Sequence, residues 1–270
     1  MTQVPTSTNA SADLAVGRGV RLDDVSHKYQ SSAGPVDALS GFSLNIGPGE
    51  FVVVVGPSGC GKSTLLEILA GLRRPTSGTV SIGESRVIGP SKSRAVVFQQ
   101  STSLLPWLNV GDNVGLGLRF RGVAKSQIQS RVHQELSRVG LVEFAGHKPY
   151  ELSGGMQQRC QLARALAVDP EVLLLDEPFG ALDALTRESL QVELRRIWRE
   201  TRKTIVMVTH SVEEAVFLGT RVIAMSSRPG RIVADIAQEF STSDLSLSQL
   251  RSESNFVTAA DELRRLLHQR

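Results

Sequence analysis

Hydrophobic and polar residues alternate along two stretches near the start of the chain. Val20 and Leu22 lie in one stretch, and Phe42, Leu44 and Ile46 lie in the other, just before a Gly-Pro-Gly turn. A period of two residues places the apolar side chains on one face of a strand and leaves the other face polar. The pattern therefore predicts half-buried antiparallel strands in this part of the chain.

Short apolar runs without polar interruption follow, and they predict buried strands. Such strands are expected at residues 52–55, 96–98, 172–175, 205–208 and 222–225. The run at 172–175 has the character of a parallel strand, because a strand covered on both faces has no polar side. We also expect two short strands to be joined by the Pro-Gly turn at residues 229–230.

Helical spacing appears between and after these runs, and the middle third of the chain is expected to be all helical. Apolar residues recur three or four positions apart in three stretches, which contain Ile128, Val132, Leu136 and Val139; Leu190, Leu194, Ile197 and Trp198; and Phe256, Ala260, Leu263 and Leu267. In the first stretch, Ser126 is the expected N-cap and Gly140 the expected stop. Together, these strands and helices predict an α/β fold.

The composition sets limits on the function. The 270 residues are 41% hydrophobic, which is ample for a packed core, and they carry a net charge of +3 with both signs interspersed. Because a nucleic-acid-binding protein concentrates its basic residues, nucleic acid is not expected as a partner. Two cysteines, Cys60 and Cys160, favour a reducing compartment. No run approaches the roughly 18 apolar residues of a membrane span, and no secretion signal opens the chain, which predicts a cytoplasmic protein.

One stretch carries a specific chemical signature. After the run at residues 52–55, the chain reads Gly56, Pro57, Ser58, Gly59, Cys60, Gly61, Lys62, Ser63 and Thr64, and a helical pattern follows. This is the phosphate-binding P-loop pattern in its required context of strand, loop and helix. The glycines let backbone N–H groups curl around an anion at the positive end of the helix dipole. Lys62 is expected to reach the β- and γ-phosphates and Ser63 to ligate Mg²⁺; a plain glycine-rich turn is the alternative.

Polar residues at the ends of three predicted strands are further candidates. Asp176 and Glu177 follow a buried strand, and in a P-loop protein the first can hold the Mg²⁺ shell while the second activates water. His210 also follows a strand; a structural role is the ordinary interpretation, but parallel sheets gather catalytic groups at their carboxyl ends. Tyr29 lies at the end of the first strand, where stacking on adenine and plain burial are both open.

A helix that begins with two glycines is the remaining unusual feature. Ser153 fits the N-cap of this helix, but Gly154 and Gly155 each cost up to about 1 kcal/mol against alanine. Glycines at this place are explained if another backbone or a phosphate approaches closely. The helix start is thus a second anion site, with no phosphate of its own within the chain.

In this order, the motifs resemble those of the nucleotide-binding subunit of an ABC transporter, across nearly the whole of residues 20–236. The matching motifs are Walker A at 56–64, the signature at 152–157, Walker B at 172–176, the Q-loop Gln99, the D-loop Asp183, the switch histidine His210 and the adenine-stacking Tyr29. Residues 89–90, 96–99, 105–107, 112–114, 179–187, 211–219 and 226–231 favour the ATPases of nitrate, sulfonate and taurine importers. The taurine branch is slightly favoured by residues 111–122.

The resemblance implies a P-loop NTPase of ABC type. Such a protein has a mixed sheet core, an antiparallel β subdomain and a helical subdomain, the last at about residues 101–165 here. The ATPase domain is expected at 20–240. A flexible tail at 1–19 precedes it, and a C-terminal extension with a helix at 241–270 follows it.

The resemblance also implies a homodimer that traps two ATP molecules, each between Walker A of one copy and the signature of the other. The signature and D-loop contacts to nucleotide are then Ser153, Gly154, Gly155, Gln157 and Asp183. Catalysis would involve Glu177 as the base, His210 at the γ-phosphate, Lys62, and Gln99, which couples the γ-phosphate to the helical third. The Mg²⁺ ligands would be Ser63, Gln99 and Asp176.

The expected function is ATP hydrolysis that powers import of taurine, an aliphatic sulfonate or nitrate. The expected partners are an integral membrane permease and, indirectly, a solute-binding protein, on the cytoplasmic face of the inner membrane. Residues 105–107, which include Trp107, are candidates to contact the permease, and a buried tryptophan is the rival interpretation. Alternatives to an importer subunit are a soluble ABC ATPase not coupled to transport, a P-loop GTPase or kinase, and an exporter ATPase.

Overall fold

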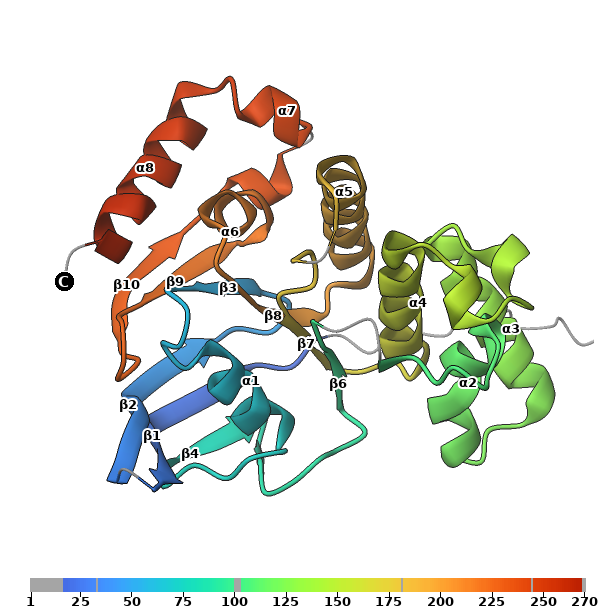
Figure 1. Ribbon diagram of the computed structural model, residues 1–270, viewed down its shortest axis with the longest axis horizontal. Coiled ribbons are helices and arrows are strands. Elements are labelled where there is room, and N and C mark those ends of the chain that lie inside the picture. The colour runs from blue at the N-terminus through green and yellow to red at the C-terminus, as the bar shows by residue number, and fades with distance from the viewer. Residues whose placement is uncertain (1–16, 33, 100–102, 181, 244, 269–270) are drawn as a thin grey trace, which may run out of the picture.

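The computed structural model describes residues 17–268 except 33, 100–102, 181 and 244 (Figure 1). Several expectations therefore fall partly outside the described residues: the tail at 1–19, the start of the helical subdomain at about 101–165, residue 181 within the family match at 179–187, and parts of the extension at 241–270. Two sheets and a set of helices make up the described chain.

The first sheet is antiparallel and has the strand order β2-β1-β4-β5. Val20 pairs with Ile46 on one side and with Ile82 on the other, and all three side chains are buried. The alternating pattern is thus confirmed: one face of the sheet is apolar and faces the core. The strands are β1 (Val20–Ser31), β2 (Gly34–Ile46), β4 (Ser77–Ile82) and β5 (Ser85–Arg86).

The second sheet is mixed and has the order β10-β9-β3-β8-β7-β6. The neighbours from β9 to β6 pair in parallel, and only β10 runs antiparallel, against β9. Every residue of β3 and β8 is buried, which explains why their sequences have no polar side. The strands are β3 (Phe51–Val55), β6 (Arg94–Val97), β7 (Val172–Asp176), β8 (Thr204–Thr209), β9 (Arg221–Met225) and β10 (Ile232–Ala237).

The two faces of β3 belong to two different hydrophobic cores. Val52 and Val54 pack with helix α1 (Lys62–Ala70) and the antiparallel sheet. Val53 and Val55 pack on the opposite side, with α5 (Ala184–Thr201), α6 (Val212–Leu218) and α8 (Ser254–His268). Figure 1 shows α1 between the two sheets and these three helices beyond the mixed sheet. The expected α/β architecture with a mixed sheet core is confirmed.

The prediction of a buried strand at 96–98 is confirmed only at Val97, because Val96 is half-buried and Phe98 lies outside the strand. Strand β6 ends at Val97, and the side chain of Phe98 is 41% exposed. Within the described chain, β6 is the edge of the mixed sheet and pairs with β7 alone, so a single neighbouring strand covers it. An apolar run therefore did not guarantee burial at this edge.

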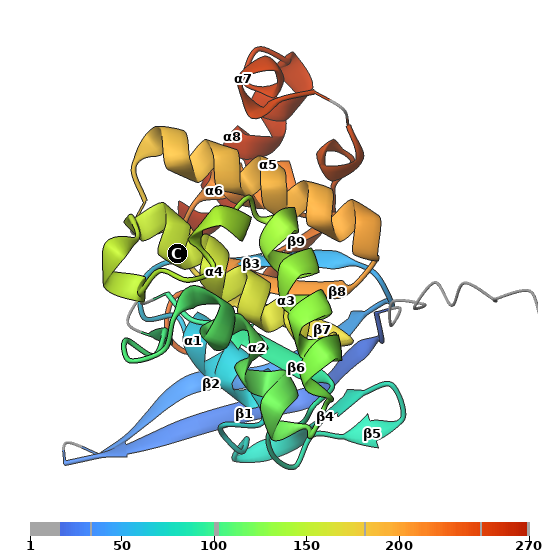
Figure 2. The same cartoon turned by 90° about the vertical axis from the view of Figure 1, so that its right-hand side faces the viewer.

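A helical segment follows β6 and lies beside the end of the mixed sheet (Figures 1 and 2). In α3, Ile128, Leu136 and the following Val139 are buried, as the helical spacing predicted. The prediction of Ser126 as N-cap is wrong, because the helix begins two residues earlier than that cap implies: Ala124 occupies the N-cap position and Ser126 lies in the first turn. The segment contains α2 (Val110–Phe120), α3 (Lys125–Arg138), η2 (Val142–Phe144), η3 (Pro149–Glu151) and α4 (Gly154–Ala167).

The chain after β10 folds back over α6. Phe256, Ala260 and Leu263 of α8 are buried, as the pattern predicted. On the surface, Glu213 of α6 forms ion pairs with Arg251 and Arg264. Two short elements lead to α8, η4 (Phe240–Thr242) and α7 (Leu247–Leu250). Among the described residues, no helix is both long and apolar enough to cross a membrane.

Candidate nucleotide-binding site

The parallel pairing brings four separate loops to one edge of the mixed sheet. Val55 pairs with Thr209, and Asp176 pairs with Val208, so β3, β7 and β8 end at nearly the same level. The loops after these strands carry the P-loop, Glu177 and His210. Strand β6, parallel to β7, delivers Gln99 to the same edge. This edge is where open α/β sheets place their ligands.

The P-loop joins β3 to α1 and packs tightly against the antiparallel sheet. Gly61 occupies the N-cap of α1 with φ 101°, and a Cβ there would lie 2.6 Å from the carbonyl oxygen of Ala38. Only glycine fits both the backbone angle and the space. The loop therefore holds the N-terminus of α1 open toward the sheet edge, as anion binding requires.

The ammonium group of Lys62 lies along this loop. Its Nζ donates to the carbonyl oxygens of Gly56 at 2.7 Å and Pro57 at 3.1 Å, and the side chain is buried. The thiol of Cys60 is also buried, 3.9 Å from Lys62 Nζ. Burial raises the pKa of the Cys60 thiol, and the nearby Lys62 charge opposes this only in part. Both the burial and the raised pKa of Cys60 favour the protonated thiol, which is the less reactive form.

A pocket of about 420 Å³ lies over the P-loop. Tyr29 lines one end, and its hydroxyl hydrogen-bonds the Thr64 hydroxyl at 2.9 Å. The guanidinium of Arg73 lies 4.7 Å from the centre of the Tyr29 ring, so the ring is fixed by a hydrogen bond and a cation–π contact. The full lining consists of Tyr29, Val36, Ala38, Ser58, Gly59, Gly61, Lys62, Ser63, Thr64, Glu177 and Arg228.

Two carboxylates stand at the end of β7 beside the pocket. The Ser63 hydroxyl donates to Asp176 Oδ1 at 3.3 Å. Burial raises the pKa of Asp176, the hydrogen bond from Ser63 opposes the shift, and the charge of Glu177 adds to it. Glu177 has φ 42°, a left-handed angle that is rare outside glycine and that turns its side chain to the sheet edge.

Glu177 Oε2 is the meeting point of two other predicted residues. Gln99 Nε2 donates to it at 3.2 Å, and His210 Nδ1 lies 3.2 Å from it. The other carboxylate oxygen, Oε1, has no hydrogen-bond partner among the residues that the structure describes. The structure thus brings Gln99 and His210 to Glu177, although they are 78 and 33 residues away from it in the sequence.

The signature residues lie elsewhere. Ser153 caps α4, as predicted, and accepts a hydrogen bond from the N–H of Met156. Gln157 donates to the carbonyl oxygens of Pro149 and Leu152 and so ties down the preceding turn. Asp183 caps α5 and its hydrogen bonds from Thr186 lower its pKa. Of the described residues that line the pocket, none comes from this group.

The two signature glycines differ in their surroundings. A Cβ on Gly155 would lie 2.2 Å from Thr186 Cγ2, so a larger residue there would crowd the side chain of Thr186 on α5 of the same chain. A Cβ on Gly154 would meet nothing within 4 Å. Among residues 152–157, Ser153 and Gly154 are the exposed positions, which a molecule from outside can approach closely.

Some pocket residues escaped the sequence reasoning. Val36 and Ala38 come from β2, and Arg228 comes from the loop between β9 and β10. Residues 226–231 were noted only as a family likeness, and nothing local to them indicates a pocket. Val36 pairs with Tyr29 across β1 and β2, so a correct register for these two strands would have placed Val36 next to a predicted site residue.

The described fold and loop define a class of protein. A glycine loop between a buried strand and a helix, in a mixed sheet whose neighbouring strand ends in two carboxylates, is the P-loop nucleoside triphosphatase architecture. The antiparallel sheet and the helical segment mark the ABC type within that class.

Comparison with known proteins identifies the family. A sequence model described as "ABC transporter" matches residues 39–180. The chain is 50% identical to the taurine import ATP-binding protein TauB of Burkholderia thailandensis over 237 residues, which cover 86% of this chain and 90% of that protein. It is 46% identical to the TauB protein of Chromobacterium violaceum over 244 residues, 89% of this chain and 92% of the other. The chain belongs to the ABC transporter family, and it is an ATPase.

Solved structures agree with this assignment. The dimeric, post-hydrolysis structure of the ATP-binding cassette MJ0796 bound to ADP and Pi superposes with a TM-score of 0.73 at 36% identity. The match covers 82% of this chain and 99% of MJ0796. A second dimeric structure of the same bacterial ABC transporter cassette gives the same values.

Proposed function

We propose that this chain is the ATP-hydrolysing subunit of an importer, which drives uptake of a small anionic or zwitterionic solute through a separate membrane permease. Taurine is the first candidate solute, because the relatives at 46–50% identity are named as taurine import proteins. The observation that carries the ATPase part is the convergence of Gln99 and His210 on Glu177 at the mouth of the P-loop pocket. Aliphatic sulfonates and nitrate are the other candidate solutes.

ATP is proposed to bind with its adenine against Tyr29 and its phosphates along the P-loop. The phosphate cradle is formed by Gly56, Pro57, Ser58, Gly59, Cys60, Gly61, Lys62, Ser63 and Thr64. The hydrogen bond between Tyr29 and Thr64 holds the Tyr29 ring where the adenine base would stack. The pocket volume of about 420 Å³ lies in the range of nucleotide-sized ligand sites.

Mg²⁺ fits the donors at the end of β7. Asp176 Oδ1 and Ser63 Oγ are adjacent hard oxygen donors, and Mg²⁺ in such sites takes one or two protein ligands together with substrate phosphates. Gln99 is the proposed third protein ligand, although its amide contacts Glu177 in this structure. When bound, Mg²⁺ supplies neutralisation of the charge on the β- and γ-phosphates.

Glu177 is the proposed general base. Its Oε2 is fixed by Gln99 and His210, which leaves Oε1 to accept the proton of a water molecule that attacks the γ-phosphorus. The bond from phosphorus to the bridging oxygen breaks as the new bond forms, and ADP and phosphate result. Lys62 stabilises the charge on the phosphate oxygens, and His210, with a 61% exposed side chain, is free to contact the γ-phosphate.

A second copy of the chain is proposed to complete each site. Ser153 and Gly154 are exposed at the N-terminus of α4, which offers an anion site outside the pocket of their own chain. Gly155 and Gln157 support this surface from below, and Asp183 is exposed at the N-cap of α5. The dimeric structures of MJ0796 support such a pairing.

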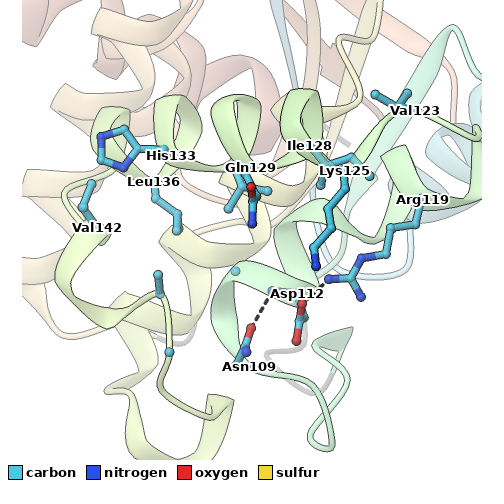
Figure 3. Close-up of a pocket in the computed structure, with 14 residues that line it drawn as sticks. Asn109, Asp112, Arg119, Val123, Lys125, Ile128, Gln129, His133, Leu136 and Val142 are labelled. Carbon is cyan, nitrogen blue, oxygen red and sulfur yellow. Dashed lines mark hydrogen bonds and ion pairs between the residues drawn. The ribbon is translucent and has the colours of Figure 1, made fainter.

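The permease is proposed to dock on the helical segment. A groove of about 880 Å³ runs between α2 and α3 (Figure 3), and its apolar walls include Val123, Ile128, Val132 and Leu136. Asp112 and Arg119 form an ion pair at one end of the groove. Trp107, just before α2, is 68% exposed, so the rival interpretation of a buried tryptophan is wrong. An exposed indole two residues before Asn109, which lines the apolar groove, is the pattern of a protein-binding surface.

The remaining parts of the proposal concern the assembly. We propose that the ATPase lies peripherally on the cytoplasmic face of the inner membrane, and that a solute-binding protein delivers the solute to the permease. Residues 20–240 are proposed as the ATPase domain, with residues 101–165 as its helical subdomain and 241–270 as an extension.

Reconstitution tests this function. The chain would be purified with the permease subunits of the same transporter, placed in liposomes, and assayed for ATP hydrolysis with the solute-binding protein and taurine. We expect taurine to stimulate hydrolysis and buffer without solute to leave it low. If neither taurine, alkanesulfonates nor nitrate stimulates hydrolysis, the importer function is contradicted. Trp107→Ala should weaken co-purification with the permease, whereas Ile88→Ala, which removes another exposed apolar side chain outside the groove, should not.

A further inference from the structure

The loop between β9 and β10 packs directly against the P-loop. The N–H of Gly230 donates to the carbonyl oxygen of Ala38 at 2.9 Å, and the N–H of Ser40 donates back to Gly230 at 3.1 Å. A Cβ on Gly230 would lie 2.1 Å from the carbonyl oxygen of Cys60. The loop therefore has a fixed position beside the phosphate-binding backbone, and so do the side chains that it carries.

Arg228 extends from this loop over the P-loop. Its Nε donates to the carbonyl oxygen of Gly59 at 3.3 Å, and one terminal nitrogen, Nη2, lies close to the Cα of Gly59, 3.4 Å from the place of an added Cβ. The side chain lines the same 420 Å³ pocket as Tyr29 and Lys62. Among the residues that the structure describes, neither Nη1 nor Nη2 has a hydrogen-bond or ion-pair partner.

Other cations near the pocket are already engaged. Lys62 donates to two P-loop carbonyl oxygens. Arg73 pairs with Glu67 and covers the Tyr29 ring. Arg231, three residues after Arg228, donates to the hydroxyl of Ser40. Arg228 is thus the cation at the pocket whose two terminal donors are uncommitted within the described chain.

We infer that Arg228 is a nucleotide-binding residue that contacts the β- and γ-phosphates of ATP from the rim of the P-loop. This inference rests on the proposed function, and it assigns to the site a cation that the P-loop motif does not contain. A guanidinium offers two parallel N–H donors to phosphate oxygens, and Gly59, to which Arg228 is tied, lies in the middle of the phosphate cradle. The hydrogen bond from Arg228 Nε to Gly59 fixes the guanidinium beside the cradle and leaves Nη1 and Nη2 available as donors.

The test compares Arg228→Gln with Arg231→Gln, a matched loss of charge from the same loop. Binding of MgATP, MgADP and AMP to the full chain would be measured by calorimetry at 50 and 300 mM NaCl. We expect Arg228→Gln to raise the Kd of MgATP and MgADP roughly tenfold at low salt, to leave AMP binding unchanged, and to flatten the salt dependence. Arg231→Gln should bind all three nucleotides as the parent chain does.

Two results would overturn the inference. One is a Kd for MgATP within twofold of the parent chain in Arg228→Gln. The other is a weakened Kd with unchanged salt dependence and a lowered unfolding temperature, which would mean that Arg228 only supports Gly59. If the parent chain itself binds no MgATP, the proposed function fails instead, so the two failures are distinguishable.

Discussion

The close packing of Gly155 on Thr186 allows a decisive test of the interface between α4 and α5. In Gly155→Ala, the new methyl group would lie 2.2 Å from Thr186 Cγ2, whereas apolar carbons pack at about 3.5–4.0 Å. Crowding of this kind costs about 1–3 kcal/mol, and alanine returns at most about 1 kcal/mol of helix propensity. We therefore expect a net loss of about 1–2 kcal/mol in the free energy of unfolding.

The partner substitution tests the cause of that loss. Thr186→Ser removes Cγ2 and leaves Cβ as the next neighbour at 3.6 Å, an ordinary contact. The double variant Gly155→Ala, Thr186→Ser should therefore regain most of the stability that Gly155→Ala loses, a coupling that a double-mutant cycle measures. Chemical denaturation with urea would give the four free energies.

Gly154→Ala is the matched control. No described atom lies within 4 Å of its added Cβ, so its unfolding free energy should equal or exceed that of the parent chain. The reasoning is refuted if Gly155→Ala is as stable as Gly154→Ala, or if Thr186→Ser restores nothing. A stable Gly154→Ala variant with reduced ATPase activity would in turn support the approach of a second copy to this surface.

Two further predictions concern titratable groups. Burial raises the pKa of Glu214, and hydrogen bonds from Thr209 and Gln191 oppose this shift. The contribution of Glu214 to the free energy of unfolding is therefore lost as pH rises from about 4.5 through the folded pKa. In urea unfolding, Glu214→Gln should become more stable relative to the parent chain over that pH range, and a stability difference independent of pH contradicts this. Cys60 is buried with a raised pKa, so iodoacetamide at pH 7 should modify it far more slowly than free glutathione, with ATP slowing it further. Alkylation of Cys60 that leaves nucleotide affinity intact contradicts its place in the cradle.

Local pattern was sufficient for much of the fold. The apolar run before Gly56 and the one before Asp176 both form buried parallel strands, because a strand covered on both faces must be apolar throughout. Ser153 was predictable as an N-cap because capping depends on a side chain and an N–H three residues away. By contrast, burial of Phe98 depends on whether a further strand lies beside β6, which no local pattern reports.

The residues of the site also fall into two groups, those that local sequence predicted and those that depend on tertiary packing. Its residues at strand ends, such as Glu177 and His210, were predictable because chain order in a parallel sheet places those ends together. Arg228 was not, because it reaches Gly59 across 169 residues through a loop whose position depends on the fold of β9 and β10. The pairing of Arg73 with the Tyr29 ring is likewise a product of tertiary packing.

ATP turnover by Glu177→Gln tests the central claim most directly. The substitution keeps the shape of the side chain and its contacts with Gln99 and His210 while it removes the carboxylate that takes the proton. With saturating MgATP, the variant is predicted to bind nucleotide and to form a dimer by size-exclusion chromatography, with a kcat about 10²–10⁴-fold below that of the parent chain. A kcat near the parent value would contradict the assignment of Glu177 as the base that makes the P-loop pocket hydrolytic.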